Sequence, residues 1–174
     1  MKLKFTRLLL LLGFTVSLAA CSKDKDEEIA SGLSCTIDGT NMTFNVNAFA
    51  LKNEGGGNYS YAVFGSSDAT ANASAFAIAL GDDAPIAPGN YTFSEDDPDD
   101  QIKMGTLNYV PAGSTTDGYI SVPGPTTTPT LITVTSVDAK SIQGTFKGDI
   151  IMLTGTTPVV KTVTNGKFNV QVMQ

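Results

Sequence analysis

Apolar and polar residues alternate with a period of two in several stretches of the chain. Phe76, Ile78 and Leu80 are separated by alanines, and the apolar positions of residues 142–152 alternate with Gln143, Thr145, Lys147 and Asp149. The same alternation occurs at residues 44–46, 91–93, 132–135 and 167–172. A period of two is typical of strands that place one face in the core and the other in water.

Turn residues separate these stretches. Asp38-Gly39 and Asn165-Gly166 are dipeptides that favour two-residue type I′ hairpin turns, and Gly55-Gly56-Gly57 predicts another hairpin loop. Residues 111–130 are rich in Pro, Gly, Ser and Thr, which predicts a long surface loop around a short strand at residues 118–122. The sequence therefore predicts one all-β domain of about 8–10 strands, either a single antiparallel β-sandwich or a small β-barrel.

The N-terminus follows a different pattern. Residues 1–7 carry three cations, and residues 8–20 are apolar and uncharged. As a helix this apolar run is about 20 Å long, short of the roughly 30 Å hydrocarbon core, so it predicts a cleaved secretory signal. Leu18-Ala19-Ala20-Cys21 resembles a bacterial lipobox, which implies that Cys21 is acylated and becomes the new N-terminus. The alternative is an ordinary signal peptide with a cysteine beside its cleavage site.

An acidic cluster follows Cys21, at residues 22–28. It resembles the export signal that sends Bacteroidota lipoproteins to the outer face of the outer membrane. It is also a charged, solvated tether, since such runs bury little apolar surface. We therefore expect a signal peptide at residues 1–20, a lipidated cysteine with its tether at 21–33, and a β-rich domain at 34–174. The expected location is the outer membrane, facing the exterior or otherwise the periplasm.

Several segments together are similar to a known family. They are Thr130 to Val134, Ser141 to Phe146 and Val163 to Val170, with Ile37-Asp38-Gly39 and Ala87 to Tyr91. The family consists of small, uncharacterised Bacteroidota lipoproteins that share a domain of unknown function. The resemblance implies a β-rich fold and a lipid anchor. It brings no established activity and no functional residues.

The composition of the chain excludes several classes of function. The chain has no His, which excludes Ser-His-Asp triads, Cys-His dyads and HExxH zinc sites. Removal of Lys2, Lys4 and Arg7 with the signal leaves 8 basic residues against 17 acidic ones, a formal net charge of −9. A domain this acidic is a poor partner for nucleic acid. We expect a protein that is not an enzyme and that binds the membrane through its lipid.

Clustered carboxylates raise the possibility of a calcium site, because calcium is bound by six to eight oxygens. The spacing does not match an EF-hand loop, and the alternative is a solvated acidic loop. No other cofactor is expected. The candidate ligands are Asp82, Asp83, Glu95, Asp96, Asp97, Asp99 and Asp100.

Three tyrosines and one cysteine are further candidates for binding or reactivity. Tyr59, Tyr109 and Tyr119 fall in or beside predicted loops, where exposed rings would stack on a glycan; the alternatives are core packing and incidental exposure. Cys35 reads as a small buried hydrophobe of the first strand rather than as a reactive thiol. With Cys21 acylated, no intramolecular disulfide is expected.

Two functions from different classes remain. The first is a non-catalytic binding module, displayed at the surface, that meets an unidentified protein or glycan through its loops. The alternative is a structural or accessory subunit of an envelope complex. A binding module should carry a contiguous patch of aromatic side chains at the end of the domain where its loops lie. An accessory subunit should instead carry an apolar sheet face or an unpaired edge strand.

Overall fold

The computed structural model describes residues 31–93, 103–114, 117–124, 127–152 and 158–173, and these residues confirm the predicted all-β fold. They form eleven strands of one sheet. In chain order the strands are β1 (Gly32–Ile37), β2 (Thr40–Phe44), β3 (Val46–Gly55), β4 (Asn58–Ser66), β5 (Ala75–Asp82), β6 (Gly89–Phe93), β7 (Met104–Val110), β8 (Tyr119–Ile120), β9 (Thr130–Val137), β10 (Ser141–Met152) and β11 (Val159–Met173).

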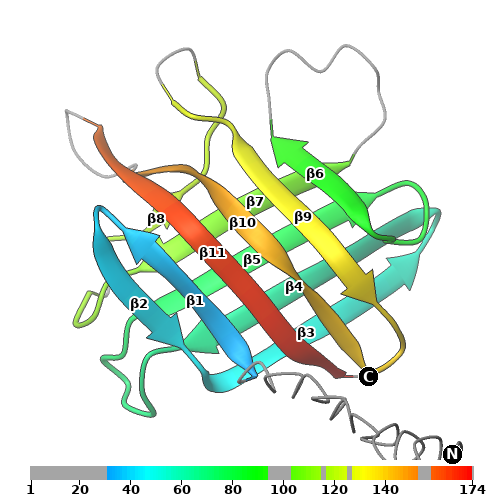
Figure 1. Ribbon diagram of the computed structural model, residues 1–174, viewed down its shortest axis with the longest axis horizontal. Helices are drawn as coiled ribbons and strands as arrows, with labels where there is room; N and C mark the ends of the chain where they lie inside the picture. The colour runs from blue at the N-terminus through cyan, green and yellow to red at the C-terminus, as the bar shows by residue number, and fades with distance from the viewer. Residues whose placement is uncertain (1–30, 94–102, 115–116, 125–126, 153–157, 174) are drawn as a thin grey trace, which may run out of the picture.

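The sheet is folded into two layers that cross at a large angle (Figure 1). One layer has the order β2-β1-β11-β10-β9-β6, and the other has the order β3-β4-β5-β7. Parallel contacts between β11 and β3 and between β6 and β7 join the layers on both sides. The pairings thus form a closed circuit, consistent with a β-sandwich or a small barrel.

The core lies between the two layers and follows the predicted alternation. In β5, Phe76, Ile78 and Leu80 are all at most 2% exposed, whereas the alanines between them are half-buried. Cys35 of β1 is 4% exposed, so the predicted buried hydrophobe is confirmed. Burial raises the pKa of the Cys35 thiol to about 12, which leaves it unreactive at neutral pH.

Two of the predicted hairpin turns are confirmed. Asp38 and Gly39 have φ angles of 49° and 82°, and Gly56 and Gly57 have φ angles of 63° and 83°. Positive φ at both central residues is what a type I′ turn requires. The first turn joins β1 to β2, the second joins β3 to β4, and both match the twist of their hairpins.

The third predicted turn is wrong. Asn165 and Gly166 lie in the middle of β11, which runs without a break from Val159 to Met173. Asn165 has a φ of 53°, and one extra residue of β11 is accommodated here against both β1 and β10. The dipeptide therefore forms a β-bulge. The left-handed residue bends β11 and does not reverse the chain, because both edges of β11 are already paired with other strands.

The N-terminal predictions lie mostly outside the described residues. Cys21, the signal peptide and the acidic tether up to residue 30 belong to that part of the chain. Strand β1 begins at Gly32, two residues before the expected start of the β-rich domain. Within the described ranges there is no helix long and apolar enough to cross a membrane.

Candidate functional site

The acidic residues proposed for calcium are only partly described. Glu95, Asp96, Asp97, Asp99 and Asp100 lie outside the described residues, whereas Asp82 and Asp83 follow one another at the end of β5. The Asp82 carboxylate is 6% exposed and accepts a hydrogen bond of 3.1 Å from the backbone N–H of Ala84, while Asp83 is exposed. In the part of the chain that the structure describes, no three metal-ligating residues gather.

Two of the three tyrosines pack in the core, which was one of the alternatives left open by the sequence. Tyr109, near the end of β7, and Tyr119, in the two-residue strand β8, are only 8% and 7% exposed. Their rings lie 6.0 Å apart within the core, and burial raises the pKa of Tyr109. They therefore provide no exposed stacking platform, because the alternation of β7 points Tyr109 inward. Tyr59 is half-buried at the start of β4.

A charged pair holds the β1–β2 turn onto β11. Asp38 accepts hydrogen bonds from the Lys161 ammonium and from the backbone N–H of Thr162, each at 2.9 Å. Lys161 also lies 5.3 Å from the centre of the Tyr119 ring. The hydrogen bond from Lys161, followed by that from Thr162, lowers the pKa of Asp38. This arrangement has a structural role, because the Asp38 carboxylate and the Lys161 ammonium form an ion pair with each other.

We expect Asp38→Asn to lower the free energy of unfolding at pH 7 by about 0.5–1 kcal/mol, a modest loss because the Asp38 side chain is 45% exposed. Asparagine keeps the left-handed conformation that this turn needs. Since folding lowers the pKa of Asp38, its contribution is present above the unfolded pKa and is lost as the pH falls through the folded one. Thermal melts of both proteins from pH 7 to 2 should therefore converge at low pH. A difference in melting temperature that stays constant from pH 7 to 2 would contradict this account.

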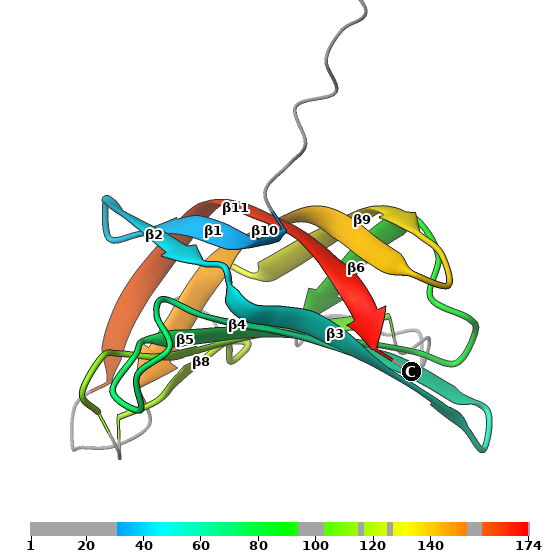
Figure 2. The same cartoon turned by 90° about the horizontal axis from the view of Figure 1, so that it is seen from below.

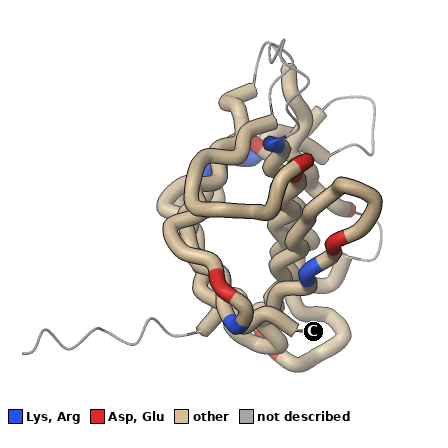
Figure 3. Tube along the Cα trace, turned by 90° about the vertical axis from the view of Figure 1, so that its right-hand side faces the viewer, with Lys and Arg blue, Asp and Glu red and all other residues tan. Residues whose placement is uncertain are grey.

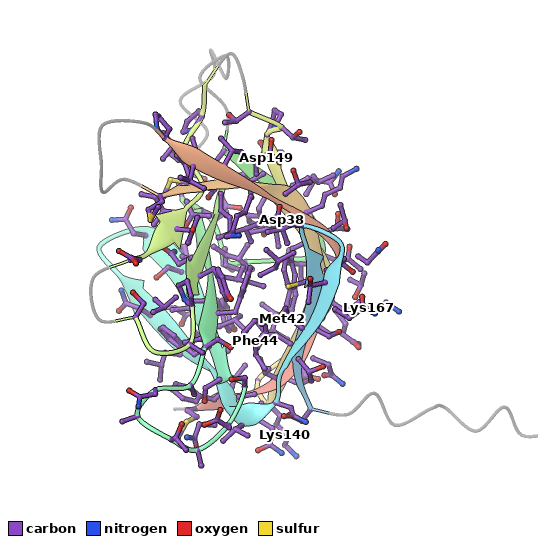
Figure 4. All side chains as sticks on the ribbon, turned by 90° about the vertical axis from the view of Figure 1, so that its left-hand side faces the viewer. Asp38, Met42, Phe44, Lys140, Asp149 and Lys167 are labelled. Atoms are coloured by element: carbon purple, nitrogen blue, oxygen red, sulfur yellow. The ribbon has the colours of Figure 1, made fainter. Side chains whose placement is uncertain are left out.

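A buried carboxylate fixes the segment before β9. One oxygen of Asp149 accepts a 2.7 Å hydrogen bond from the backbone N–H of Thr128, and the Asp149 N–H donates to the Thr128 carbonyl at 3.1 Å. The other oxygen, Oδ1, is buried and has no hydrogen-bond partner among the described residues. Figure 4 shows Asp149 at the end of the molecule where the loops lie. A single carboxylate does not make a cation site, so its role here is to hold Thr128 against β10.

The outer face of the β2-β1-β11-β10-β9-β6 layer is polar. The hydroxyl of Thr133 donates a 2.9 Å hydrogen bond to the side-chain oxygen of Asn90, which lies opposite it. Lys167 points outward from the same face (Figure 4). A hollow of about 220 Å³ lies on this face beside Gly32, Ser34 and Asn169, and its lining is mainly apolar. One outward row across six strands consists of Thr43, Ser34, Lys167, Thr145, Thr133 and Asn90.

The outer face of the other layer is apolar. Directly opposite residues of neighbouring strands share a face, so the register gives rows such as Leu51, Ala62 and Ala79. The Phe49 and Phe64 rings lie 5.4 Å apart within it. We call this surface the apolar face; it consists of Phe49, Leu51, Ala62, Phe64, Ala75, Ala77, Ala79, Met104 and Val110, with Met173 of β11 at its edge.

Within the described strands, no charged residue occupies an outward position of β3, β4, β5 or β7. The remaining outward positions on β4, β5 and β7 are Ser, Gly, Thr and Asn, and the ion pair of Lys52 with Glu54 occupies positions of β3 that face the other side of the sheet. Among the described residues, four of the six most exposed large hydrophobic side chains belong to the apolar face: Leu51, Met104, Val110 and Met173, at 39–52% exposure. Figure 3 likewise shows long stretches of strand without a charged position.

Sequence reasoning missed the apolar face, although the signal was present. The period of two predicts that the alanines between Phe76, Ile78 and Leu80 lie on the solvent-exposed face of a half-buried strand. In fact Ala75 to Leu80 is a continuous apolar run, and Tyr61 to Phe64 is another. Continuous runs are typical of strands that are covered on both faces. β4 and β5 therefore have the composition of strands with a second covered face.

No protein-family model, curated protein or solved structure matches this chain. The resemblance to the uncharacterised Bacteroidota lipoproteins stays a prediction from the sequence segments that carry it.

Proposed function

We propose that the protein is a lipid-anchored, non-catalytic interaction module of a bacterial envelope, and that it meets a protein partner through the apolar face. The observation that carries this proposal is the uncharged outer surface of β3, β4, β5 and β7. Four strands spaced about 4.8 Å apart, over about seven residues of 3.4 Å, give this face an extent of roughly 450 Å², which includes its uncharged polar positions. The largest apolar patch on a typical monomer covers about 300–600 Å² and is often an interaction site.

The shape of this surface favours a protein over a small ligand. Sites for small molecules are concave and carry a few converging polar groups. The centre of the apolar face is instead formed by Ala62, Ala77 and Ala79, whose methyl groups give a flat floor. A flat apolar floor offers broad contact to another sheet or to a helix. This favours the accessory-subunit hypothesis over a module that binds through its loops.

The position of the expected anchor is compatible with this role. β1, the strand that follows the predicted tether, belongs to the layer opposite the apolar face (Figure 2). Ser31 lies ten positions after Cys21, and an extended chain of that length reaches about 35 Å. An anchor of this reach leaves the apolar face accessible to neighbours in the envelope.

The anchor is tested by Cys21→Ala in cells that make the protein. We expect the variant to leave the membrane fraction, because two or three acyl chains are needed for stable attachment. Protease added to intact cells should remove the wild-type domain if it faces the exterior, while a periplasmic control survives. A Cys21→Ala protein that stays fully in the membrane fraction would show that the lipid is not the anchor.

The interaction surface is tested by Ala79→Glu on the full chain, with Thr145→Glu on the opposite face as the matched control. A carboxylate placed in the middle of the apolar face must be desolvated on binding, which costs several kcal/mol. We expect affinity purification from membranes to lose the partner with Ala79→Glu, by about 100-fold or more, and to retain it with Thr145→Glu. Equal recovery with both variants would overturn the proposal.

A further inference from the structure

Strand β2 differs from the other strands because only one of its edges is paired. Each of the other ten described strands pairs with at least two neighbours, whereas β2 pairs with β1 alone. It forms the left border of its layer in Figure 1. We propose that β2 is a second interaction site, where an extended segment of a partner protein, with an aliphatic and an acidic side chain, adds to the sheet. This site lies on the layer opposite the apolar face and goes beyond the function proposed above.

The β1–β2 hairpin fixes which backbone groups of β2 face β1. Ile37 and Thr40 flank the two-residue turn and exchange hydrogen bonds with each other. Hydrogen-bonded and non-hydrogen-bonded pairs alternate along an antiparallel ladder, so Met42 and Phe44 also bond to β1. The N–H and C=O groups of the residues between them point to the other edge.

These residues are Asn41 and Thr43. A separate contact agrees with their assignment: the Asp38 N–H, next to Ile37 in the alternation, donates to the Thr162 carbonyl of β11 at 3.0 Å, on the side away from β2. Neither Asn41 nor Thr43 has a backbone hydrogen-bond partner in the part of the chain that the structure describes. A row of unpaired N–H and C=O groups is what another extended backbone pairs with.

β2 has few of the features by which proteins protect an exposed edge. Such edges are usually interrupted by lysine, proline or a bulge, or are kept short. β2 contains no lysine and no proline, and its pairing with β1 has no bulge. It is short, with five residues, but it still offers Asn41 and Thr43 to an added strand. The edge is therefore open to strand addition.

The hollow on the outer face lies beside this edge and indicates the side chains of the added strand. Thr43 and Asn45 contribute to its mainly apolar lining, and its volume is about 220 Å³. A residue opposite Thr43 would share its face, and positions roughly 7–8 Å away on the diagonal are within reach of a long side chain. Lys167 also lines the hollow, points outward (Figure 4) and forms no ion pair with a described residue. An aliphatic side chain would fill the hollow, and a carboxylate would complement Lys167.

The same features argue against a second copy of β2 as the added strand. The side chains that β2 presents on the outer face are those of Asn41 and Thr43, which are neither aliphatic nor acidic. A copy of β2 would leave the hollow unfilled and Lys167 without a counter-charge. The chemistry of the site therefore favours a segment of a different protein.

The free edge is tested first, by amide hydrogen exchange at single residues of the purified full chain in mild detergent. We expect the amides of Asn41 and Thr43 to exchange about 100-fold faster than those of Met42 and Phe44, which are bonded to β1. Equal protection of all four amides would show that the edge is already covered and would overturn the proposal. This measurement needs no substitution, so it does not depend on the folding of a variant.

The partner is tested in the cells that make the protein, with a photoreactive side chain at position 41 of the full chain. We expect an adduct with a different protein. Thr43→Pro removes an N–H that points away from β1, which edge strands tolerate, and should lower the adduct yield by about tenfold or more. Thr43→Val keeps this N–H and is the matched control, for which we expect an unchanged yield. Thermal melts of both purified variants check that they are folded.

Equal adduct yields with Thr43→Pro and Thr43→Val would show that the contact does not use the backbone edge, and would overturn the proposal. Adducts only within the same chain or with a second copy of it, or no adduct at all, would overturn it as well. None of these outcomes depends on the apolar face, so the proposed function is tested separately by Ala79→Glu.

Discussion

Phe76→Ala is expected to lower the free energy of unfolding by about 3–5 kcal/mol. The Phe76 ring is 1% exposed and lies between the two layers. Its centre is 5.4 Å from Phe44, 6.2 Å from Tyr109 and 5.1 Å from Phe146. These contacts join β5 to β2, β7 and β10, so the cavity left by alanine would lie where both layers meet.

Urea unfolding followed by circular dichroism measures this effect. Phe76→Leu is the conservative comparison, because it keeps most of the volume and should cost less than half as much. A domain at the low end of the usual stability range of about 5–15 kcal/mol would be only marginally folded with Phe76→Ala. A loss below about 1 kcal/mol would mean that the two layers do not pack through this ring.

Gly166→Ala is expected to cost about 3 kcal/mol or more, although it adds a single methyl group. A Cβ atom built at Gly166 would lie 2.4 Å from the carbonyl oxygen of Phe146 and 2.5 Å from its ring. The carbonyl belongs to the paired strand β10 and has little freedom to move. The bulge at Asn165 therefore depends on a glycine at the next position, over which the Phe146 ring packs.

Gly81→Ala is the matched control for this substitution. Gly81 also lies in a strand, but a Cβ atom there would have no heavy atom within 4 Å. We expect Gly81→Ala to be neutral or slightly stabilising, because alanine loses less backbone entropy on folding. Similar losses of thermal stability for the two variants would show that the Phe146–Gly166 contact is not tight.

Local patterns predicted much of the fold. The alternation around Phe76 and from Ile142 to Lys147 assigned inward and outward positions correctly, since a half-buried strand imposes a period of two on its sequence, whereas Asp149, assigned outward, is buried. The same reasoning failed at Asn165-Gly166, where the dipeptide alone favours a hairpin. The bulge is set by partners far away in the chain, β1 and β10, and these partners were not visible in the local sequence.

The closure of the sheet was also beyond local pattern. The parallel contact of Gln171, Val172 and Met173 with Phe49, Ala50 and Leu51 joins residues more than 120 positions apart. The apolar face arises from the antiparallel pairing of β3, β4, β5 and β7, which places their outward positions on one continuous surface. Within a single strand, the apolar face is indicated only by a run in which the inward and the outward positions are both apolar.

The most direct test of the central claim places a photoreactive side chain at position 79 or at position 145, in cells that make the protein. The account predicts protein adducts after irradiation from position 79, on the apolar face, and none from position 145, on the polar face. Adducts from position 145 alone, or from neither position, would contradict the assignment of β3, β4, β5 and β7 as the interaction surface.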